Sequence, residues 1–229
     1  MRVLAIETST LLGGVAVVDD GQGLVAEARL NVRTTHSERL MPEIDRTLRL
    51  AGLRLNDIDV FAASSGPGSF TGLRIGLSTL KGLAYATGKP VVAVPTLEAL
   101  AWNFPMSTHP VCVLLDARKK EVYAGVFLRE AEGFRRLVPE QSVKIRELLA
   151  GLGDYGRLIF SGEGALLYRA EISEILGPRA VFAPPHLMVP MPSGTAYLGM
   201  MKAMKGQFDD PAGLRPFYIR KAEAELKAL

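Results

Sequence analysis

The sequence is poor in the residues that disulfide-bonded and membrane-spanning proteins need. Its 229 residues include a single cysteine, Cys112, which cannot form an internal disulfide. Cys112 lies in the apolar run VCVLL, where a cysteine behaves as a small buried hydrophobic residue. No apolar run reaches the roughly 20 residues of a membrane-spanning helix, and the N-terminal stretch MRVLAIETST lacks the apolar segment of a signal peptide. We therefore predict a cytoplasmic protein.

Motifs for metal binding and for hydrolysis are also missing. The three histidines, His36, His109 and His186, form no i,i+4 pair, and neither H-E-x-x-H nor C-x-x-C occurs. The G-x-S-x-G motif of α/β-hydrolases is absent, although a Ser/His/Asp triad assembled from distant segments stays open. The net charge of +3 is mild and no run of five basic residues occurs, so the basic residues favour a solvated surface over a nucleic-acid site.

What the sequence does contain is an alternation of strand-like and helical patterns, with enough apolar residues (48%) for a sizeable core. Thr35 with Glu38 fits a helix capping box, although Pro42 predicts a bend or a separate first turn in the helix that follows. In the first half the expected strands cover 2–7, 13–18, 24–30, 59–64 and 91–94, and the expected helices cover 36–51, 71–86 and 96–103.

The second half partly repeats this order. Its expected strands cover 111–116, 121–128, 134–138 and 157–161, and its expected helices cover 142–152, 163–176 and 193–205. A β-β-β-α-β-α unit used twice is the plan of the actin-like ATPase (ASKHA) fold, an α/β fold with two related subdomains. Because prolines cluster at 105–110, we predict one subdomain at 1–106 and a second at 107–229, with a tail that could return to the first.

The segment SSGPGSFTGLR (64–74) joins an expected strand to an expected helix, as many phosphate-binding turns do. It lacks the lysine of G-x-x-x-x-G-K-[ST], and its glycines are spaced G-x-G-x-x-x-G instead of G-x-G-x-x-G. An anion at Ser69–Thr71 remains a minority hypothesis. Because glycine costs about 1 kcal/mol in a helix interior, the small face formed by Gly72, Gly76 and Thr79 indicates close helix packing, within the chain or between subunits.

Two turns are candidate remnants of a nucleotide site. In actin-like ATPases the first turn carries an aspartate and small hydroxyl residues near the phosphates, and Glu7, Thr8 and Ser9 occupy that place here. The alternative, which we favour, is that the hydroxyl groups satisfy hydrogen bonds of the turn itself. Asp116 lies at the corresponding turn of the second half, and 161–164 would be a third turn, where a glutamate would repel a phosphate. The expected vestigial nucleotide or anion site comprises Glu7, Thr8, Ser9, Ser69 and Asp116.

Five segments, in this order along nearly the whole chain, resemble the TsaB (YeaZ) family of tRNA threonylcarbamoyladenosine biosynthesis. They are LAIETST at 4–10, THSERLMP at 35–42, SSGPGSFTGLRIGL at 64–77, DARKKEVYAGVF at 116–127 and RPFYIR at 215–220. The glycine-rich segment is the most specific of them. The resemblance implies the actin-like fold with two subdomains, in agreement with the pattern of strands and helices.

The resemblance also implies a non-catalytic scaffold. In the family, TsaD works with TsaB and the ATPase TsaE. TsaD transfers the threonylcarbamoyl group from threonylcarbamoyl-AMP to N6 of the adenosine just 3′ of the anticodon, in tRNAs that read codons beginning with A. TsaD carries a His-x-x-x-His metal motif, and Thr96 and Leu100 stand at the matching positions here. We therefore expect no catalytic residue, no metal and no required cofactor, with ATP or ADP at most at a subunit interface.

The partners that the resemblance implies are TsaD, TsaE and a second copy of the chain, with tRNA contacted indirectly through the complex and no membrane. Pairing in the family uses helices of the N-terminal subdomain, which here begin near residues 36 and 71. Arginine at Gly76 is accordingly expected to abolish pairing and to leave the fold intact. The expected interface residues are His36, Leu40, Ile44, Leu48, Thr71, Gly72, Ile75, Gly76 and Thr79.

Two other functions stay open. The fold, together with Glu7 and Asp116, is compatible with an independent actin-like ATPase or small-molecule kinase. A peptidase, the activity with which the wider family was once grouped, is the weakest interpretation because the sequence offers no metal ligands.

Overall fold

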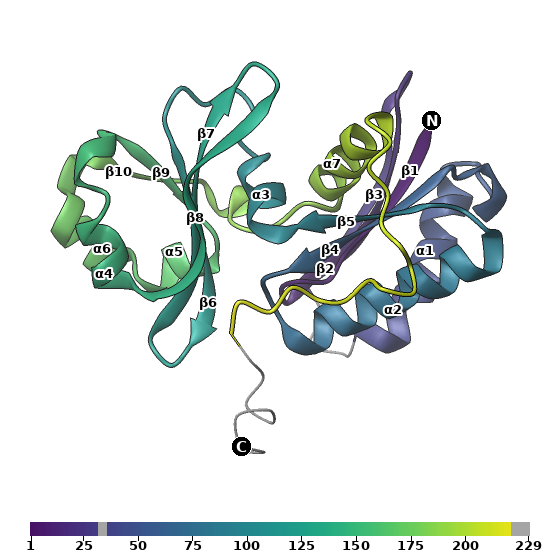
Figure 1. Cartoon of the computed structure of the whole chain (residues 1–229), viewed down its shortest axis with the longest axis horizontal. Helices are drawn as coiled ribbons and strands as arrows, with labels where there is room; N and C mark the ends of the chain where they lie inside the picture. The colour runs from purple at the N-terminus through teal and green to yellow at the C-terminus, as the bar shows by residue number, and fades with distance from the viewer. Residues whose placement is uncertain (32–35, 221–229) are drawn as a thin grey trace. The chain divides into compact units, whose positions relative to one another are not determined.

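The computed structural model describes residues 1–31 and 36–220, and Figure 1 shows the order of its elements. The predicted capping box of Thr35 with Glu38 lies outside the side chains that it describes. The contacts divide the chain into two compact units, Met1–Ala99 with Pro190–Phe217, and Leu100–Val189 with the segment from Tyr218 on.

The first unit is built on a five-stranded sheet of order β3-β2-β1-β4-β5. β1 pairs antiparallel with β2 and parallel with β4, and β4 pairs parallel with β5. Its elements are β1 (Arg2–Glu7), β2 (Leu12–Asp19), β3 (Gly23–Asn31), α1 (His36–Leu50), η1 (Leu55–Asp57), β4 (Val60–Gly66), α2 (Phe70–Thr87), β5 (Val91–Pro95), α3 (Thr96–Ala101) and α7 (Pro192–Met204).

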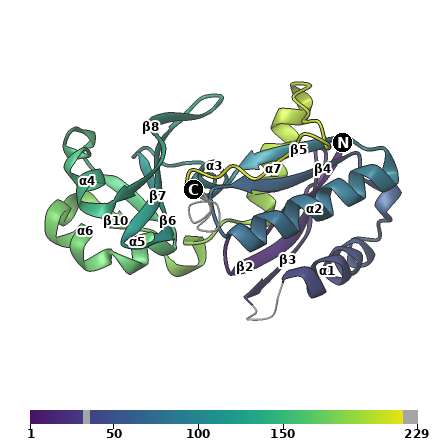
Figure 2. The ribbon, with the colours of Figure 1, turned by 60° about the horizontal axis from the view of Figure 1, so that its bottom comes forward.

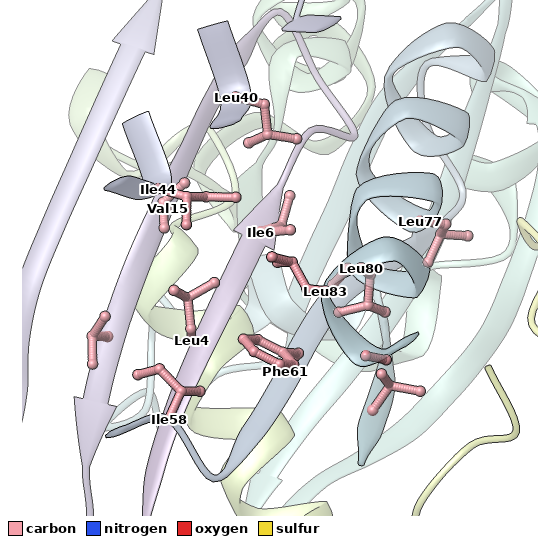
Figure 3. Close-up of a cluster of buried hydrophobic side chains, with 14 of the residues drawn as sticks. Leu4, Ile6, Val15, Leu40, Ile44, Ile58, Phe61, Leu77, Leu80 and Leu83 are labelled. Atoms are coloured by element: carbon pink, nitrogen blue, oxygen red, sulfur yellow. The ribbon is translucent and has the colours of Figure 1, made fainter. Parts of the chain in front are cut away.

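Both faces of this sheet are covered, by α1 and α2 on one side and by α7 on the other (Figures 1 and 2). Because successive side chains of a strand point to opposite faces, Leu4 and Ile6 meet α1 and α2, whereas Val3 faces α7. Figure 3 shows the core on the α1/α2 side, where Phe61 and Leu80 are fully buried. A sheet covered on both faces reads as a continuous apolar run, which explains the pattern VLAI in β1.

The second unit repeats the plan, with a five-stranded sheet of order β10-β9-β6-β7-β8. Its core gathers residues of β6, β7 and β9 with the helices that cover them, and Cys112 is buried there. Burial raises the pKa of the Cys112 thiol. Its elements are β6 (Val111–Arg118), β7 (Glu121–Glu130), β8 (Gly133–Lys144), α4 (Ile145–Ala150), η2 (Gly153–Tyr155), β9 (Leu158–Ser161), α5 (Glu163–Leu167), α6 (Arg169–Leu176), η3 (Gly177–Arg179), β10 (Ala180–Phe182) and η4 (Pro185–Leu187).

The predicted α/β fold with two actin-like units is confirmed, since both sheets have the same strand order. The observed division differs from the one expected at residue 106: the boundary falls within α3, between Ala99 and Leu100, and residues 190–217 lie with the first unit. The reason is α7, whose Gly199 packs directly on β4: a Cβ added there would lie 2.6 Å from the Cβ of Ala62. A helix that fits one sheet so closely belongs to that sheet, whatever its position in the sequence.

Three local predictions in the second unit were wrong. The third strand runs to Lys144, through Pro139, and the following helix is short. Proline is tolerated there because β8 is an edge strand, and the pairing with β7 is irregular near it. The helix expected at 163–176 is divided at Tyr168 into α5 and α6, and β10 was not predicted.

Among the residues that the structure describes, no helix combines the length and the apolar character that a membrane span needs.

Candidate functional site

The carboxylate of Glu7, at the end of β1, is fully buried and hydrogen-bonded. Its Oε1 accepts hydrogen bonds from the backbone N–H (2.8 Å) and the hydroxyl of Ser9 and from the hydroxyl of Ser64 (2.9 Å). Its Oε2 accepts one from the hydroxyl of Thr195 (2.9 Å). A buried carboxylate needs such donors, because burying it without partners costs several kcal/mol. Glu7 therefore joins β1, β4 and α7, and its oxygen atoms are engaged by the protein's own donors.

The small face of α2 packs on the β1–β2 turn of the same chain. The hydroxyl of Thr8 donates to the carbonyl oxygen of Gly72 (2.8 Å). A Cβ added at Gly72 would lie 1.9 Å from the Thr8 carbonyl oxygen, and one at Gly76 would lie 2.3 Å from the Thr8 hydroxyl oxygen. The interface role expected for these two glycines is therefore wrong, since both are buried inside the protomer. Arginine at Gly76 would disrupt the fold itself.

The two earlier glycines of the segment make room for backbone. A Cβ at Gly68 would lie 2.4 Å from the carbonyl oxygen of Ser9, and one at Gly66 would lie 2.4 Å from that of Phe217. Both glycines also have positive φ, +158° and +121°, where an L side chain is strained. The segment SSGPGSFTGLRIG thus brings together LAIETST at the N-terminus and RPFYIR near the C-terminus.

Two backbone N–H groups at the N-terminus of α2 make hydrogen bonds within the chain. The hydroxyl of Ser69 caps the helix by accepting a hydrogen bond from the N–H of Gly72 (3.3 Å), and the N–H of Ser69 donates to the carbonyl oxygen of Ser9 (2.7 Å). An anion at Ser69–Thr71 would compete with these contacts. The hydroxyl groups of Ser9 and Thr10 donate within the first turn, to Glu7 Oε1 and to the Leu12 carbonyl oxygen, as the favoured interpretation expects. The hydroxyl of Thr8 instead donates to Gly72 of α2.

The tail after α7, yellow in Figure 1, returns to β5 and β4 of the first unit. The N–H of Asp209 donates to the carbonyl oxygen of Val91 (2.9 Å), and the Asp209 carboxylate accepts from the N–H of Ala93 (2.7 Å). Farther on, the N–H of Phe217 donates to the carbonyl oxygen of Ser65 (2.7 Å). The tail therefore closes the free edge of β5 and reaches the start of the glycine-rich segment.

Truncation of the chain after Gly206 is expected to destabilise the first unit by several kcal/mol, because it removes these three hydrogen bonds, at roughly 1 kcal/mol each, and uncovers the edge of β5. Urea unfolding of the truncated and full chains measures the difference. The substitution Asp209→Asn, which keeps the backbone contact, is the milder control. An unchanged midpoint for the truncated chain would show that the tail contributes nothing to the unit.

The exposed residues of α1 and α2 differ from the interface residues expected from the sequence. Leu40, Ile44 and Leu48 of α1 are 6%, 1% and 5% exposed and belong to the core, so their assignment to an interface was wrong (Figure 3). Thr71 is exposed, whereas Ile75 and Thr79 are half-buried. His36 is the first residue of α1, and its side chain lies outside the described residues.

The exposed face of α2 forms a stripe at helical spacing, which we call the outer stripe. Tyr85 is 95% exposed, and a Cβ added at Gly82 would meet nothing within 4 Å. Helical periodicity could have located this stripe, because it lies opposite the buried leucines of the same helix. The outer stripe consists of Thr71, Arg74, Ser78, Gly82 and Tyr85.

In the second unit, two carboxylates lie close together beside the β6–β7 turn, one near the end of β6 and one at the start of α5. Asp116 is exposed, and its carboxylate accepts a hydrogen bond from the N–H of Arg118 (2.8 Å). Burial, and then the charge of Asp116, raise the pKa of Glu163, which accepts a hydrogen bond from the N–H of Asp116. Two neighbouring carboxylates repel a phosphate, so this turn offers no evident place for one.

The structure also places the positions that match the TsaD metal motif. Thr96 and Leu100 are fully buried, and the hydroxyl of Thr96 has no hydrogen-bond partner among the residues that the structure describes. Within residues 1–31 and 36–220, no three His, Cys, Asp or Glu side chains are grouped so that they could bind a metal ion. Ser64 and Thr195, which complete the hydrogen bonding of Glu7, were not identified from the sequence, because they lie 57 and 188 residues away from it.

Comparison with known proteins adds the family. The family model described as "TsaD: tRNA N6-adenosine threonylcarbamoyltransferase" matches residues 27–228. A Bacillus subtilis protein named "tRNA threonylcarbamoyladenosine biosynthesis protein TsaB" is 32% identical over 228 residues, covering 99% of this chain and 97% of that protein. The solved structure of YeaZ from Pseudomonas aeruginosa is 26% identical with a TM-score of 0.82, covering 95% of this chain and 99% of that one.

A more distant structure matches in fold alone. The component A of (R)-2-hydroxyglutaryl-CoA dehydratase from Acidaminococcus fermentans has a TM-score of 0.52 at 14% identity, covering 89% of this chain and 99% of that one. Taken with the repeated sheet order, these likenesses define a protein of the actin-like ATPase fold class. Within that class, the chain belongs to the TsaB (YeaZ) family.

Proposed function

We propose that this chain takes part in tRNA threonylcarbamoyladenosine synthesis as a non-catalytic scaffold and activating subunit. In this proposal it works with TsaD and TsaE, which together transfer the threonylcarbamoyl group from threonylcarbamoyl-AMP to N6 of the adenosine next to the anticodon. The observation that carries the proposal is the likeness to a protein named for this biosynthesis, which extends over 99% of the chain. The chain needs no cofactor of its own in this role, and it acts in the cytoplasm.

The state of Glu7 supports a role without catalysis. A first-turn carboxylate that serves a nucleotide must be able to face the phosphates or their metal ion. Glu7 is 0% exposed and accepts four hydrogen bonds from Ser9, Ser64 and Thr195. Freeing it would leave these donors unpaired at a cost of about 1–3 kcal/mol each. Its position therefore favours a structural use of the turn that nucleotide-binding relatives use for chemistry.

The surface that we propose for pairing with TsaD, or with a second copy, is the outer stripe of α2. An aromatic side chain that is almost fully exposed, Tyr85, is the kind of residue that anchors interfaces. Gly82 lets a partner backbone approach closely, since it has no side chain and no described residue lies within 4 Å of a Cβ added there. The stripe replaces the buried glycine face as the proposed interface and keeps the helix that the family resemblance indicated.

Gly82→Arg is expected to abolish co-purification with TsaD, because it adds a long charged side chain to the outer stripe beside Tyr85 while leaving the packing of the chain untouched. Gly153→Arg, in the second unit, is the matched control, since a Cβ there also meets nothing within 4 Å. Affinity capture of TsaD by each tagged variant measures pairing. Normal recovery of TsaD by the Gly82 variant would exclude this surface.

Reconstitution tests the function itself. The chain is expected to be required for modification of a tRNA transcript by TsaD and TsaE, and the Gly82→Arg variant is expected to lose this activity together with pairing. The alternative is an independent ATPase or small-molecule kinase, with which the fold class is compatible. Calorimetry with ATP and Mg²⁺ on the isolated chain distinguishes the two, since tight binding with turnover would favour the enzyme. ATP or ADP bound only when TsaD is present would place a nucleotide at a subunit interface.

A further inference from the structure

The turn between β6 and β7 has an unusual combination of backbone and sequence. Arg118 pairs with Glu121, so Lys119 and Lys120 form a two-residue hairpin turn beyond the arrowhead of β6 in Figure 1. The φ angles of Arg118, Lys119 and Lys120 are +60°, +53° and +64°. Three consecutive residues with positive φ are rare outside glycine and asparagine, and here all three are basic and exposed.

The local physics favours other residues at this turn. Two-residue hairpins of type I′ require positive φ at both central positions, which is why Asn-Gly and Asp-Gly are preferred there. A lysine in the left-handed region is strained, and three adjacent cations repel one another. Where a sequence breaks local rules without a gain in packing, a functional reason is expected. The side chains of Arg118, Lys119 and Lys120 are exposed, so burial in the core does not explain them.

The surroundings of the turn leave an excess of positive charge. Glu121 is engaged by Arg220 (3.5 Å) and by the hydroxyl of Ser142 (2.9 Å). Lys144 is exposed and lies opposite Glu121 in the strand pairing, so it adds a cation at the same end of the sheet. The acids here are Asp116, whose carboxylate accepts the Arg118 N–H, Glu121, and Glu163 beside Asp116. Among the described residues named here, the five cations Arg118, Lys119, Lys120, Lys144 and Arg220 outnumber the three carboxylates.

We propose that the β6–β7 turn is a direct contact for the phosphate backbone of tRNA. This inference rests on the proposed function, and it goes beyond the indirect tRNA contact expected from the sequence. Lysine and arginine on an exposed, narrow turn are suited to phosphates, which they bind as charges without reading bases. In an extended strand, successive side chains point to opposite faces, so only every second residue would present its charge on one face. The left-handed backbone of this turn carries three cations within three consecutive residues.

The variant Lys119→Asn with Lys120→Gly separates binding from folding. Asn-Gly is the preferred dipeptide of this turn, so the variant is expected to unfold at the same or a higher temperature than the parent chain. Its affinity for an unmodified tRNA transcript is expected to fall about tenfold at low salt, because two phosphate contacts are lost. The slope of log affinity against log salt is expected to become shallower by about 2.

Two controls assign the effect to charge at this place. Arg135→Gln with Arg136→Gln removes the same net charge at the other end of β7, where these residues pair with Leu128 and Phe127, and it is expected to leave binding nearly unchanged. Lys119→Arg with Lys120→Arg keeps the charge and is expected to bind like the parent. Equal losses in all three variants would overturn the proposal. So would unchanged binding by the Asn-Gly variant, or a parent chain that does not bind the transcript at low salt.

The same variant in the reconstituted complex shows whether the contact is used. With TsaD and TsaE present, the Asn-Gly variant is expected to raise KM for tRNA several-fold and to leave kcat unchanged, while TsaD recovery stays normal. An unchanged KM would overturn the proposal even if modification proceeds. If the parent chain adds nothing to the activity of TsaD and TsaE, the proposed function fails, and the binding of the transcript by the chain alone still decides the phosphate contact.

Discussion

Replacing Gly72 with alanine is expected to destabilise the chain by about 4 kcal/mol or more, which is among the largest effects of a single methyl group. The added Cβ would lie 1.9 Å from the carbonyl oxygen of Thr8, which belongs to the backbone and cannot rotate away. To admit it, α2 must separate from the β1–β2 turn, and this breaks the hydrogen bond from the Thr8 hydroxyl to the Gly72 carbonyl oxygen. Urea unfolding followed by circular dichroism measures the change.

The control for this result lies three turns farther along the same helix. Gly82→Ala adds the same methyl group where nothing lies within 4 Å, so the gain in helix propensity is expected to stabilise the isolated chain by up to about 1 kcal/mol. Both variants should be unfolded at equal protein concentration, because self-association would shift the midpoints. Similar midpoints for the two variants would contradict the packing of α2 on the first turn.

Glu7→Ala is expected to have the second largest effect. It should lower the free energy of unfolding by about 3–5 kcal/mol, when most domains have a total of about 5–15 kcal/mol. The substitution removes a buried acceptor and leaves the donors of Ser9, Ser64 and Thr195 without their partner. We expect the packing of α7 on the sheet to loosen first, because the hydroxyl of Thr195 in α7 donates a hydrogen bond directly to Glu7. Hydrogen exchange of the amides of α7 measures that loosening, alongside the unfolding midpoint.

Glu7→Gln separates the hydrogen bonds of this carboxylate from its charge. The amide oxygen can still accept from Ser9 and Ser64, and the hydroxyl of Thr195 can rotate to accept from the amide nitrogen. We therefore expect the free energy of unfolding of this variant to fall by about 1–2 kcal/mol, less than for Glu7→Ala. If alanine and glutamine were equally tolerated, with α7 as well protected as in the parent, Glu7 would not be the structural link described here.

Sequence periodicity predicted most elements of the first unit because its strands and helices carry strong local signals. α2, expected at 71–86, spans Phe70–Thr87, with Ser69 as its N-cap and Gly88 in the left-handed conformation at its end. α1 runs through Pro42, which the pattern had marked as a bend. In the second unit the sequence patterns were weaker. Pro139 suggested that the third strand ends before it, although β8 continues to Lys144, and the three residues of β10 are too few to show a pattern.

The sequence predicted some members of the candidate site, such as Glu7 and Thr8, but not their contacts. Glycine spacing indicated that something packs closely on α2, and the identity of that neighbour, Thr8, required the register of the sheet. Leu40, Ile44 and Leu48 show the same limit, because a helical apolar face has the same pattern whether it meets its own core or a partner.

The amino-acid sequence alone determined the class of fold, the family and the absence of the common nucleotide and metal motifs, since these depend on residue types at short spacing. Only the tertiary structure decided the use of each motif. Glu7 meets Ser64 and Thr195, and Gly66 meets Phe217, across 57 to 188 residues of chain. Contacts over such separations follow from how the sheet and α7 pack, and packing depends on all elements at once and leaves no local pattern in the sequence.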